Sequence, residues 1–235
     1  MLSKLRKFFR KGGEDPFDDE DFSWMFPPQD LLDPDAWDQY WISHLEHGIG
    51  PQFADMFCWD DELVGAMIRA DVKSVLCVGS GISQEPRALA EAGFTVVAMD
   101  LSPTAIEIAR SVDFTGDDVG SFFDPKFRRP GGSIDFVVGN FLDPCVCAGP
   151  FDVIIERRTA QLFAARDLDA VMSKLSNRLS ENGIFFSHCH EASGGPWDEP
   201  IHFATPWFRD NGWSDWYGEG EKPAGRVAWT FISTG

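Results

Sequence analysis

Hydrophobic positions in this chain follow two alternating patterns. Residues 75–78 and 94–100 are short apolar runs rich in valine, which is typical of strands buried on both faces of a parallel sheet. Apolar positions recur at helical spacing in residues 103–110, where Ile106 and Ala109 fall on one inward face. Strands that alternate with helices in this way predict an α/β domain.

A similar pair of elements occurs later in the chain. Residues 168–183 predict an amphipathic helix that stops at Asn182-Gly183, and residues 184–190 predict the strand after it. One stripe of this helix is apolar and consists of Leu168, Val171, Met172, Leu175 and Leu179.

The turn after the first strand is rich in glycine. Residues 79–81 read Gly-Ser-Gly, which lets the backbone turn sharply and approach a ligand without a Cβ in the way. Ser83 is placed to cap the next helix, Pro86 falls in its first turn, and Gly93 is placed to end it. The turn therefore leads directly into a helix N-terminus.

Asp100 stands at the tip of the second strand. It lies about 20 residues beyond the glycine turn, the spacing at which an acid reaches ribose hydroxyls in dinucleotide-binding folds. Residues 79–84 lack the sixth-position glycine of the full fingerprint, so the turn alone is a weak indication. Ser102 as an N-cap and Pro103 as the first helical residue strengthen it.

Residues 75–83 and 100–110 resemble the first and second motifs of class I S-adenosylmethionine-dependent methyltransferases. The resemblance covers roughly residues 61–235. It implies a doubly wound, Rossmann-like sheet of seven mostly parallel strands, with an antiparallel C-terminal strand and helices on both faces. Its later parts are the third strand at 134–143, the fourth strand and acceptor loop at 149–163, the fifth strand at 184–190, a last helix at 202–213 and closing strands at 225–234.

Within this superfamily, the chain looks most like the thiopurine methyltransferase-like small-molecule enzymes. Those enzymes fold an aromatic N-terminal helix over the cofactor, and residues 37–53 offer aromatic side chains for that role: Trp37, Tyr40, Trp41 and Phe53. Cys77 replaces an acid of the family's first motif, and Ser83 replaces its third glycine.

The resemblance implies a site for S-adenosylmethionine and an adjacent site for the methyl acceptor. No metal site is assigned. The implied cofactor-binding residues are Trp37, Trp41, Gly79, Ser80, Gly81, Ser83, Asp100, Leu101, Ser102, Asn140, Phe141 and Glu156, and the catalytic candidates are Glu156, Arg157, His188 and His190.

The resemblance also implies a role for each of these residues. The glycine turn would hold the methionine end, Asp100 the ribose, and Asn140-Phe141 the adenine. A base is needed only if the acceptor carries a proton at neutral pH. Glu156 has a structural alternative, which is to pair with Arg157 or Arg158.

The chain divides into three parts. Residues 1–35 are expected to be a flexible charged tail, residues 36–60 a lid helix region, and residues 61–235 the methyltransferase domain. Residues 1–13 carry five basic side chains, and residues 14–38 carry ten acidic and no basic ones. The basic piece could contact an anionic membrane surface, although a frayed terminus is the favoured interpretation.

Charge and cysteine content limit the partners. A net charge of −18 argues against a phosphate-backbone partner, so nucleic acid is disfavoured. The five cysteines are an odd number without disulfide-framework spacing, which favours reduced thiols in the cytoplasm. Cys145-x-Cys147 is too short for an ordinary zinc pair, while His188 and His190 would share a strand face, a geometry that can also chelate a metal.

Three functions remain open at this point. The favoured one is methyl transfer to an oxygen, nitrogen or sulfur nucleophile of a small molecule. A non-catalytic cofactor-binding or regulatory protein on the same fold is the second. A nicotinamide-dependent oxidoreductase is the third, and the missing sixth glycine and the run after Asp100 speak against it. Oligomeric state cannot be derived from these patterns.

Overall fold

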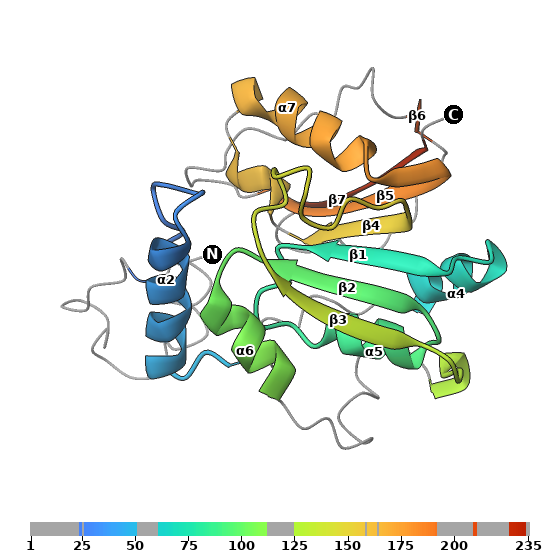
Figure 1. Cartoon of the computed structure of the whole chain (residues 1–235), viewed down its shortest axis with the longest axis horizontal. Helices are drawn as coiled ribbons and strands as arrows, with labels where there is room; N and C mark the ends of the chain where they lie inside the picture. The colour runs from blue at the N-terminus through green and yellow to red at the C-terminus, as the bar shows by residue number, and fades with distance from the viewer. Residues whose placement is uncertain are drawn as a thin grey trace, which may run out of the picture.

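The computed structural model describes residues 24, 26–50, 61–111, 125–157, 159–163, 165–191, 209–210 and 226–233. Its centre is a single sheet with the strand order β3-β2-β1-β4-β5-β7-β6 (Figure 1). The strands are β1 (Ser74–Val78), β2 (Thr95–Asp100), β3 (Ser133–Val138), β4 (Phe151–Arg157), β5 (Leu179–Glu191), β6 (Arg209–Asp210) and β7 (Arg226–Ser233).

The direction of the strands confirms the predicted fold class. Strands β1 to β5 pair in parallel, whereas β7 pairs antiparallel with both β5 and β6. The chain order reverses between β1 and β4, which lie side by side. In doubly wound sheets, ligands bind at such a switch point, beyond the carboxyl ends of the strands.

The helices lie around this sheet (Figure 1). They are α2 (Pro34–Glu46), α4 (Asp61–Arg69), α5 (Glu85–Glu91), α6 (Pro103–Ser111) and α7 (Ala165–Ser176), with short 3-10 helices η3 (Pro125–Phe127) and η4 (Ala160–Leu162). None of the helices in the described ranges is long and apolar enough to cross a membrane.

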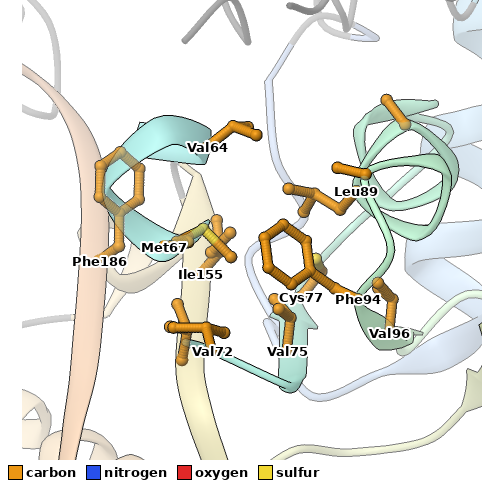
Figure 2. Packing of buried hydrophobic residues seen from close by; sticks show 13 residues of the cluster. Val64, Met67, Val72, Val75, Cys77, Leu89, Phe94, Val96, Ile155 and Phe186 are labelled. Carbon is orange, nitrogen blue, oxygen red and sulfur yellow. The ribbon is translucent and has the colours of Figure 1, made fainter. Parts of the chain in front are cut away.

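Alternate positions of the strands feed two separate cores, one on each face. On one face, Val75 and Cys77 of β1 pack with Met67 of α4 and Leu89 of α5, as Figure 2 shows. On the other face, Leu76 of β1 packs in a second cluster, which includes Val171 and Leu175 of α7. This two-sided burial explains why the β1 run is apolar at every position.

Two helix ends agree with the predicted stop and start signals. Gly93 follows α5 with a φ of +95°, a conformation that glycine adopts without strain. Helix α6 begins at Pro103, and the Ser102 Oγ accepts a hydrogen bond from the Ala105 amide at 3.0 Å. Ile106 and Ala109 are both buried, as expected.

The predicted stop of the later helix was wrong. Helix α7 ends at Ser176, and Leu179 already belongs to β5, where it pairs with Phe151. The amide of Arg178 bonds to the Leu175 carbonyl, and the Arg178 carbonyl accepts from the Phe151 amide at 2.8 Å. Because Leu179 is buried in the strand as it would be in a helix, the apolar pattern could not separate the two.

A second correction concerns the predicted last helix at 202–213. Within it, Arg209 and Asp210 are extended and pair with Ser233 and Ile232 of β7. Pairing with the sheet edge satisfies their backbone in place of helical bonds. The rest of that segment, the basic residues 1–13 and the lid residues 51–60 lie outside the described residues.

Candidate active site

The glycine turn lies at the carboxyl end of β1 and has no space for side chains at its two glycines. Gly79 and Gly81 have φ values of +61° and +53°. A Cβ on Gly79 would lie 2.1 Å from the Thr159 Oγ1, and a Cβ on Gly81 would lie 2.7 Å from the Trp41 Cζ2. Both positions therefore require glycine for conformation and for space.

Asp100 connects the turn to the second strand. Its Oδ2 accepts a hydrogen bond from the Gly81 amide at 2.8 Å, and its Oδ1 accepts one from the Ser102 amide at 2.9 Å. Burial raises the pKa of this carboxyl, hydrogen bonds from the Ser102, Gly81 and Leu101 amides oppose the rise, and nearby Asp38 adds to it. The predicted ribose-binding acid also holds the turn in shape.

Helix α2 reaches this turn through Trp41. The Trp41 ring lies against Gly81, and its Nε1 is a buried donor without a hydrogen-bond partner among the described residues. Trp37, the other predicted lid residue, uses its Nε1 to donate to the Leu31 carbonyl at 3.0 Å. The structure thus brings Trp41, and not the Trp37 indole N–H, to the glycine turn.

The start of α5 differs slightly from the prediction. Gln84 occupies the N-cap position, one residue after Ser83. Ser83 still contributes, because its Oγ accepts a hydrogen bond from the Glu85 amide at 3.1 Å. Ser80, within the turn, has a buried Oγ without a hydrogen-bond partner in the described part of the chain.

The loop after β3 contains the predicted adenine contacts. The Asn140 Oδ1 accepts a hydrogen bond from the Leu142 amide at 2.8 Å, and the Phe141 ring meets Phe163 edge-on at 5.8 Å. The amide of Gly139 donates to the Asp100 carbonyl at 2.9 Å. This bond places the loop next to the tip of β2, as the cofactor prediction requires.

Arg178 supports this loop and was missed in the sequence. Its guanidinium is almost fully buried and donates to four carbonyl oxygens, those of Asp143, Val146, Cys147 and Lys174. An arginine at a helix end is usually solvent-exposed, and no local pattern indicates that it will bind a loop about 30 residues away.

Glu156 and Arg157 hold different parts of the loop after β4. The Glu156 Oε2 accepts hydrogen bonds from the Thr159 and Ala160 amides at 2.9 and 3.0 Å, and its side chain is buried. Arg157 forms a two-pronged ion pair with Glu85 of α5, with one Nε–Oε2 distance of 2.7 Å. Both residues therefore support neighbouring elements, and Arg158, the other suggested partner of Glu156, lies outside the described residues.

His188 and His190 lie at alternate positions of β5, opposite Trp229 and Val227 of β7. Their backbone supports the expectation that they share a face. Their side chains lie outside the described part. Among the side chains that are described, no group of three or more His, Cys, Asp or Glu residues could hold a metal ion.

A third histidine, His44 of α2, was not predicted. It is buried against the rings of Trp24, Tyr40 and Trp41, and its Nδ1 lies 2.8 Å from the Tyr40 carbonyl. Since a carbonyl only accepts, Nδ1 carries the proton. Burial lowers the pKa of His44, the Tyr40 bond opposes this, and His47 lowers the pKa further, so the neutral form is favoured.

A hollow of about 980 Å³ lies away from this chemistry. It is lined by the ends of α5 and α6 and the start of β3, including Arg87, Arg110, Arg128 and Arg129. These elements meet at the amino ends of the strands, whereas the glycine turn and Asp100 lie at the carboxyl ends. The hollow is therefore not the candidate active site.

Comparison with known proteins identifies the class. Residues 76–187 match the family model described as "Methyltransferase domain". This segment contains the glycine turn, Asp100 and the loops after β3 and β4. The match supports a class I S-adenosylmethionine-dependent methyltransferase domain, as its motifs predicted, with S-adenosylmethionine as the cofactor.

One curated relative is magnesium-protoporphyrin O-methyltransferase from Rhodobacter capsulatus. It is 29% identical over 111 residues, which cover 47% of this chain and 43% of the relative. The chain thus matches less than half the length of that protein. The nearer likeness to thiopurine methyltransferases is not supported by this relative and stays a prediction.

Solved methyltransferase structures are also similar. The plantazolicin methyltransferase BpumL in complex with SAH has 16% identity and a TM-score of 0.46, with 68% of this chain and 56% of that chain covered. An S-adenosylmethionine-dependent methyltransferase from Clostridium acetobutylicum has 18% identity and a TM-score of 0.44, with coverage of 63% and 56%. Because both TM-scores are low, the fold assignment depends on the strand order and the family match.

The residues at the glycine turn fit this cofactor. The Trp41 Nε1 and Ser80 Oγ are buried polar groups without partners in the described ranges, and the methionine end offers a carboxylate and an amine that can pair with them. The Asp100 carboxylate accepts hydrogen bonds from the Gly81, Ser102 and Leu101 amides, and because a carboxylate has about four acceptor sites, it retains capacity for a ribose hydroxyl.

Proposed function

We propose that this protein transfers a methyl group from S-adenosylmethionine to a small-molecule acceptor with an oxygen, nitrogen or sulfur nucleophile. One observation carries the proposal: the glycine turn and Asp100, which lie inside the segment that matches the family, meet Trp41 of α2, whose Nε1 is buried, beyond the carboxyl ends of β1 and β2. A cytoplasmic location and the absence of a nucleic-acid partner belong to the same proposal.

The cofactor supplies an electrophilic methyl group on a sulfonium. The task of the chain is to orient that methyl group toward the acceptor and to exclude water. Gly79 and Gly81 allow close backbone approach, Asp100 accepts from the ribose, and the Asn140-Phe141 loop adjoins the adenine. Trp41 covers the turn and keeps water from it.

The four catalytic candidates divide into two pairs. Glu156 and Arg157 are engaged by backbone amides and by Glu85, so we assign them to the support of the loop after β4. His188 and His190 are the proposed proton acceptors, for those acceptors that carry a proton at neutral pH.

The test is calorimetric titration of wild type and Asp100→Asn with S-adenosylmethionine, its demethylated product and a nicotinamide dinucleotide. We expect the first two ligands to bind wild type, about tenfold or more weaker binding to the variant through loss of a charged hydrogen bond, and no binding of the dinucleotide. Binding of the dinucleotide alone would overturn the proposal in favour of an oxidoreductase.

Turnover separates the enzyme from a binding protein. Acceptors should be screened by formation of the demethylated cofactor, starting with magnesium protoporphyrin because of the Rhodobacter relative. Cofactor binding without turnover on any carboxylate, hydroxyl, amine or thiol acceptor would favour the non-catalytic function.

A further inference from the structure

Asp38 joins helix α2 to the first turn of helix α6. Its Oδ1 accepts a hydrogen bond from the Ser102 hydroxyl and another from the Thr104 amide at 3.0 Å. First-turn amides have no partner within their own helix. Ser102 caps the Ala105 amide and Pro103 has no N–H, so Asp38 completes the capping of α6 from a different helix.

The capped segment also carries the cofactor-binding acid. The Ser102 amide donates to Asp100, while the Ser102 hydroxyl donates to Asp38. Ser102 is completely buried. One serine therefore links the carboxylate assigned to the ribose with a carboxylate on α2, and a shift of α2 would disturb both hydrogen bonds.

Asp38 and Trp41 are three residues apart, so they lie on the same face of α2. Asp38 contacts α6 on one side, and Trp41 lies against Gly81 of the glycine turn on the other. Figure 1 shows α2 beside α6 at the edge of the fold. Helix α2 is thus attached to α6 through Asp38, and it covers the glycine turn through Trp41, one helical turn further along.

We propose that Asp38 is a positioning residue that holds α2, and with it Trp41, over the bound cofactor. The inference depends on the proposed cofactor site. Asp38 touches no reacting atom in this scheme, and it acts by keeping the cofactor from dissociating. Its negative charge lies close to Asp100, so the same contact has an electrostatic cost that a neutral acceptor would avoid.

The experiment compares Asp38→Ala, Asp38→Asn and Gln39→Ala with wild type. Gln39 is an exposed residue of the same helix and serves as the matched control. Calorimetry gives the affinity for S-adenosylmethionine, and stopped-flow tryptophan fluorescence during displacement gives its dissociation rate. We expect Asp38→Ala to bind about tenfold more weakly, mainly through faster dissociation, because two hydrogen bonds are lost.

The isosteric variant separates positioning from a general defect in folding. Asparagine at position 38 keeps an acceptor oxygen, so we expect Asp38→Asn to stay within about threefold of wild type. Gln39→Ala should match wild type. If Asp38→Ala retains wild-type affinity and dissociation rate, the inference is overturned while the proposed function stands.

Amide exchange of Thr104 provides a readout without cofactor. The Asp38→Ala variant should expose this amide and speed its exchange, with little change at β1. Equal exchange at Thr104 would show that Asp38 does not hold this contact, which also overturns the inference. If wild type binds no S-adenosylmethionine at all, the proposed function fails and the inference fails with it.

Discussion

At the scale of single residues, the site depends on positions where two constraints coincide. Gly81 has a positive φ and lies against Trp41, and its amide donates to Asp100. Asp100 must remain an acceptor while it is buried beside Asp38. Substitutions at such positions should weaken cofactor binding more than the number of atoms added or removed would suggest.

The first prediction concerns Gly81→Ala. Its methyl group would displace Trp41, so we expect cofactor affinity to fall about tenfold or more, beyond the roughly 1 kcal/mol that positive φ costs any alanine. Gly48→Ala is the control, because Gly48 has a φ of +75° with nothing near its Cβ position. Equal effects of both variants on affinity would contradict the role of the Trp41 contact.

The second prediction is a pH dependence of cofactor binding. Burial raises the pKa of Asp100, and the ionised form is the better acceptor for ribose hydroxyls. Affinity should therefore rise with pH until Asp100 is fully ionised in the free protein, with a slope of at most about tenfold per pH unit. Calorimetry across pH 4 to about 7 checks this, and Asp100→Asn should lack the dependence.

At the scale of elements, side chains join strands and loops that are distant in sequence. Asp152 of β4 accepts from the amides of Lys73 and Ser74 at 2.8 and 3.0 Å and from the Ser180 hydroxyl at 3.2 Å. Arg178 joins the end of α7 to the loop after β3. Neither residue belongs to a recognisable motif.

The third prediction concerns Asp152→Asn. Burial raises the pKa of Asp152, but the hydrogen bonds from Lys73, Ser74 and Ser180 outweigh it and the net pKa is lowered. The ionised carboxylate thus stabilises the fold above the ordinary aspartate pKa of 3.8, and this stabilisation is lost as pH falls through the lower folded value.

We expect the variant to lose about 1–2 kcal/mol of unfolding free energy at neutral pH, and less below pH 3.8. Urea titrations at several pH values measure the difference. Asp135→Asn, at an exposed position of β3, is the control. A difference that does not change with pH would argue against the charged hydrogen bonds.

The fourth prediction concerns Arg178→Lys. A lysine ammonium cannot reach four carbonyls in the fixed geometry of a guanidinium, so we expect a loss of about 2–3 kcal/mol in unfolding free energy. The loop with Asn140-Phe141 should loosen, and cofactor affinity should fall as well. Arg129→Lys, at an exposed arginine, is the control. If Arg178→Lys lowers the unfolding free energy but leaves cofactor affinity unchanged, the loop after β3 does not contribute to cofactor binding.

At the scale of the whole molecule, charge and topology act in different ways. The net charge of −18 makes contact with a phosphate backbone unfavourable, whatever the fold. The reversal of strand order between β1 and β4 determines where a ligand binds, whatever the charge.

The fifth prediction follows from that charge. We expect no binding of duplex DNA or RNA in a mobility-shift assay at physiological ionic strength. The protein has too few lysine and arginine side chains, relative to its acidic ones, to neutralise phosphates and release their counterions. Lowering the salt should not produce a complex with affinity better than millimolar. A salt-sensitive, tighter complex would show that the arginines around the amino ends of the strands outweigh the overall charge.

The sequence by itself determined the elements and the class. Apolar runs identified β1 and β2, because strands buried on both faces cannot tolerate polar positions. The glycine turn, Asp100 and the Ser102-Pro103 helix start were predicted from local chemistry, and they now lie in the matched domain. These features need only neighbouring residues to be recognised.

Only the tertiary structure decided which distant groups meet. Asp38 caps a helix 66 residues away, and Arg157 pairs with Glu85 of a distant helix. Helix α7 ended at Ser176 because β5 begins by pairing Leu179 with Phe151 of β4, which the apolar stripe could not indicate. The physical reason is common to all three: such contacts join residues that are distant in sequence and are brought together by the fold, and no local periodicity indicates them.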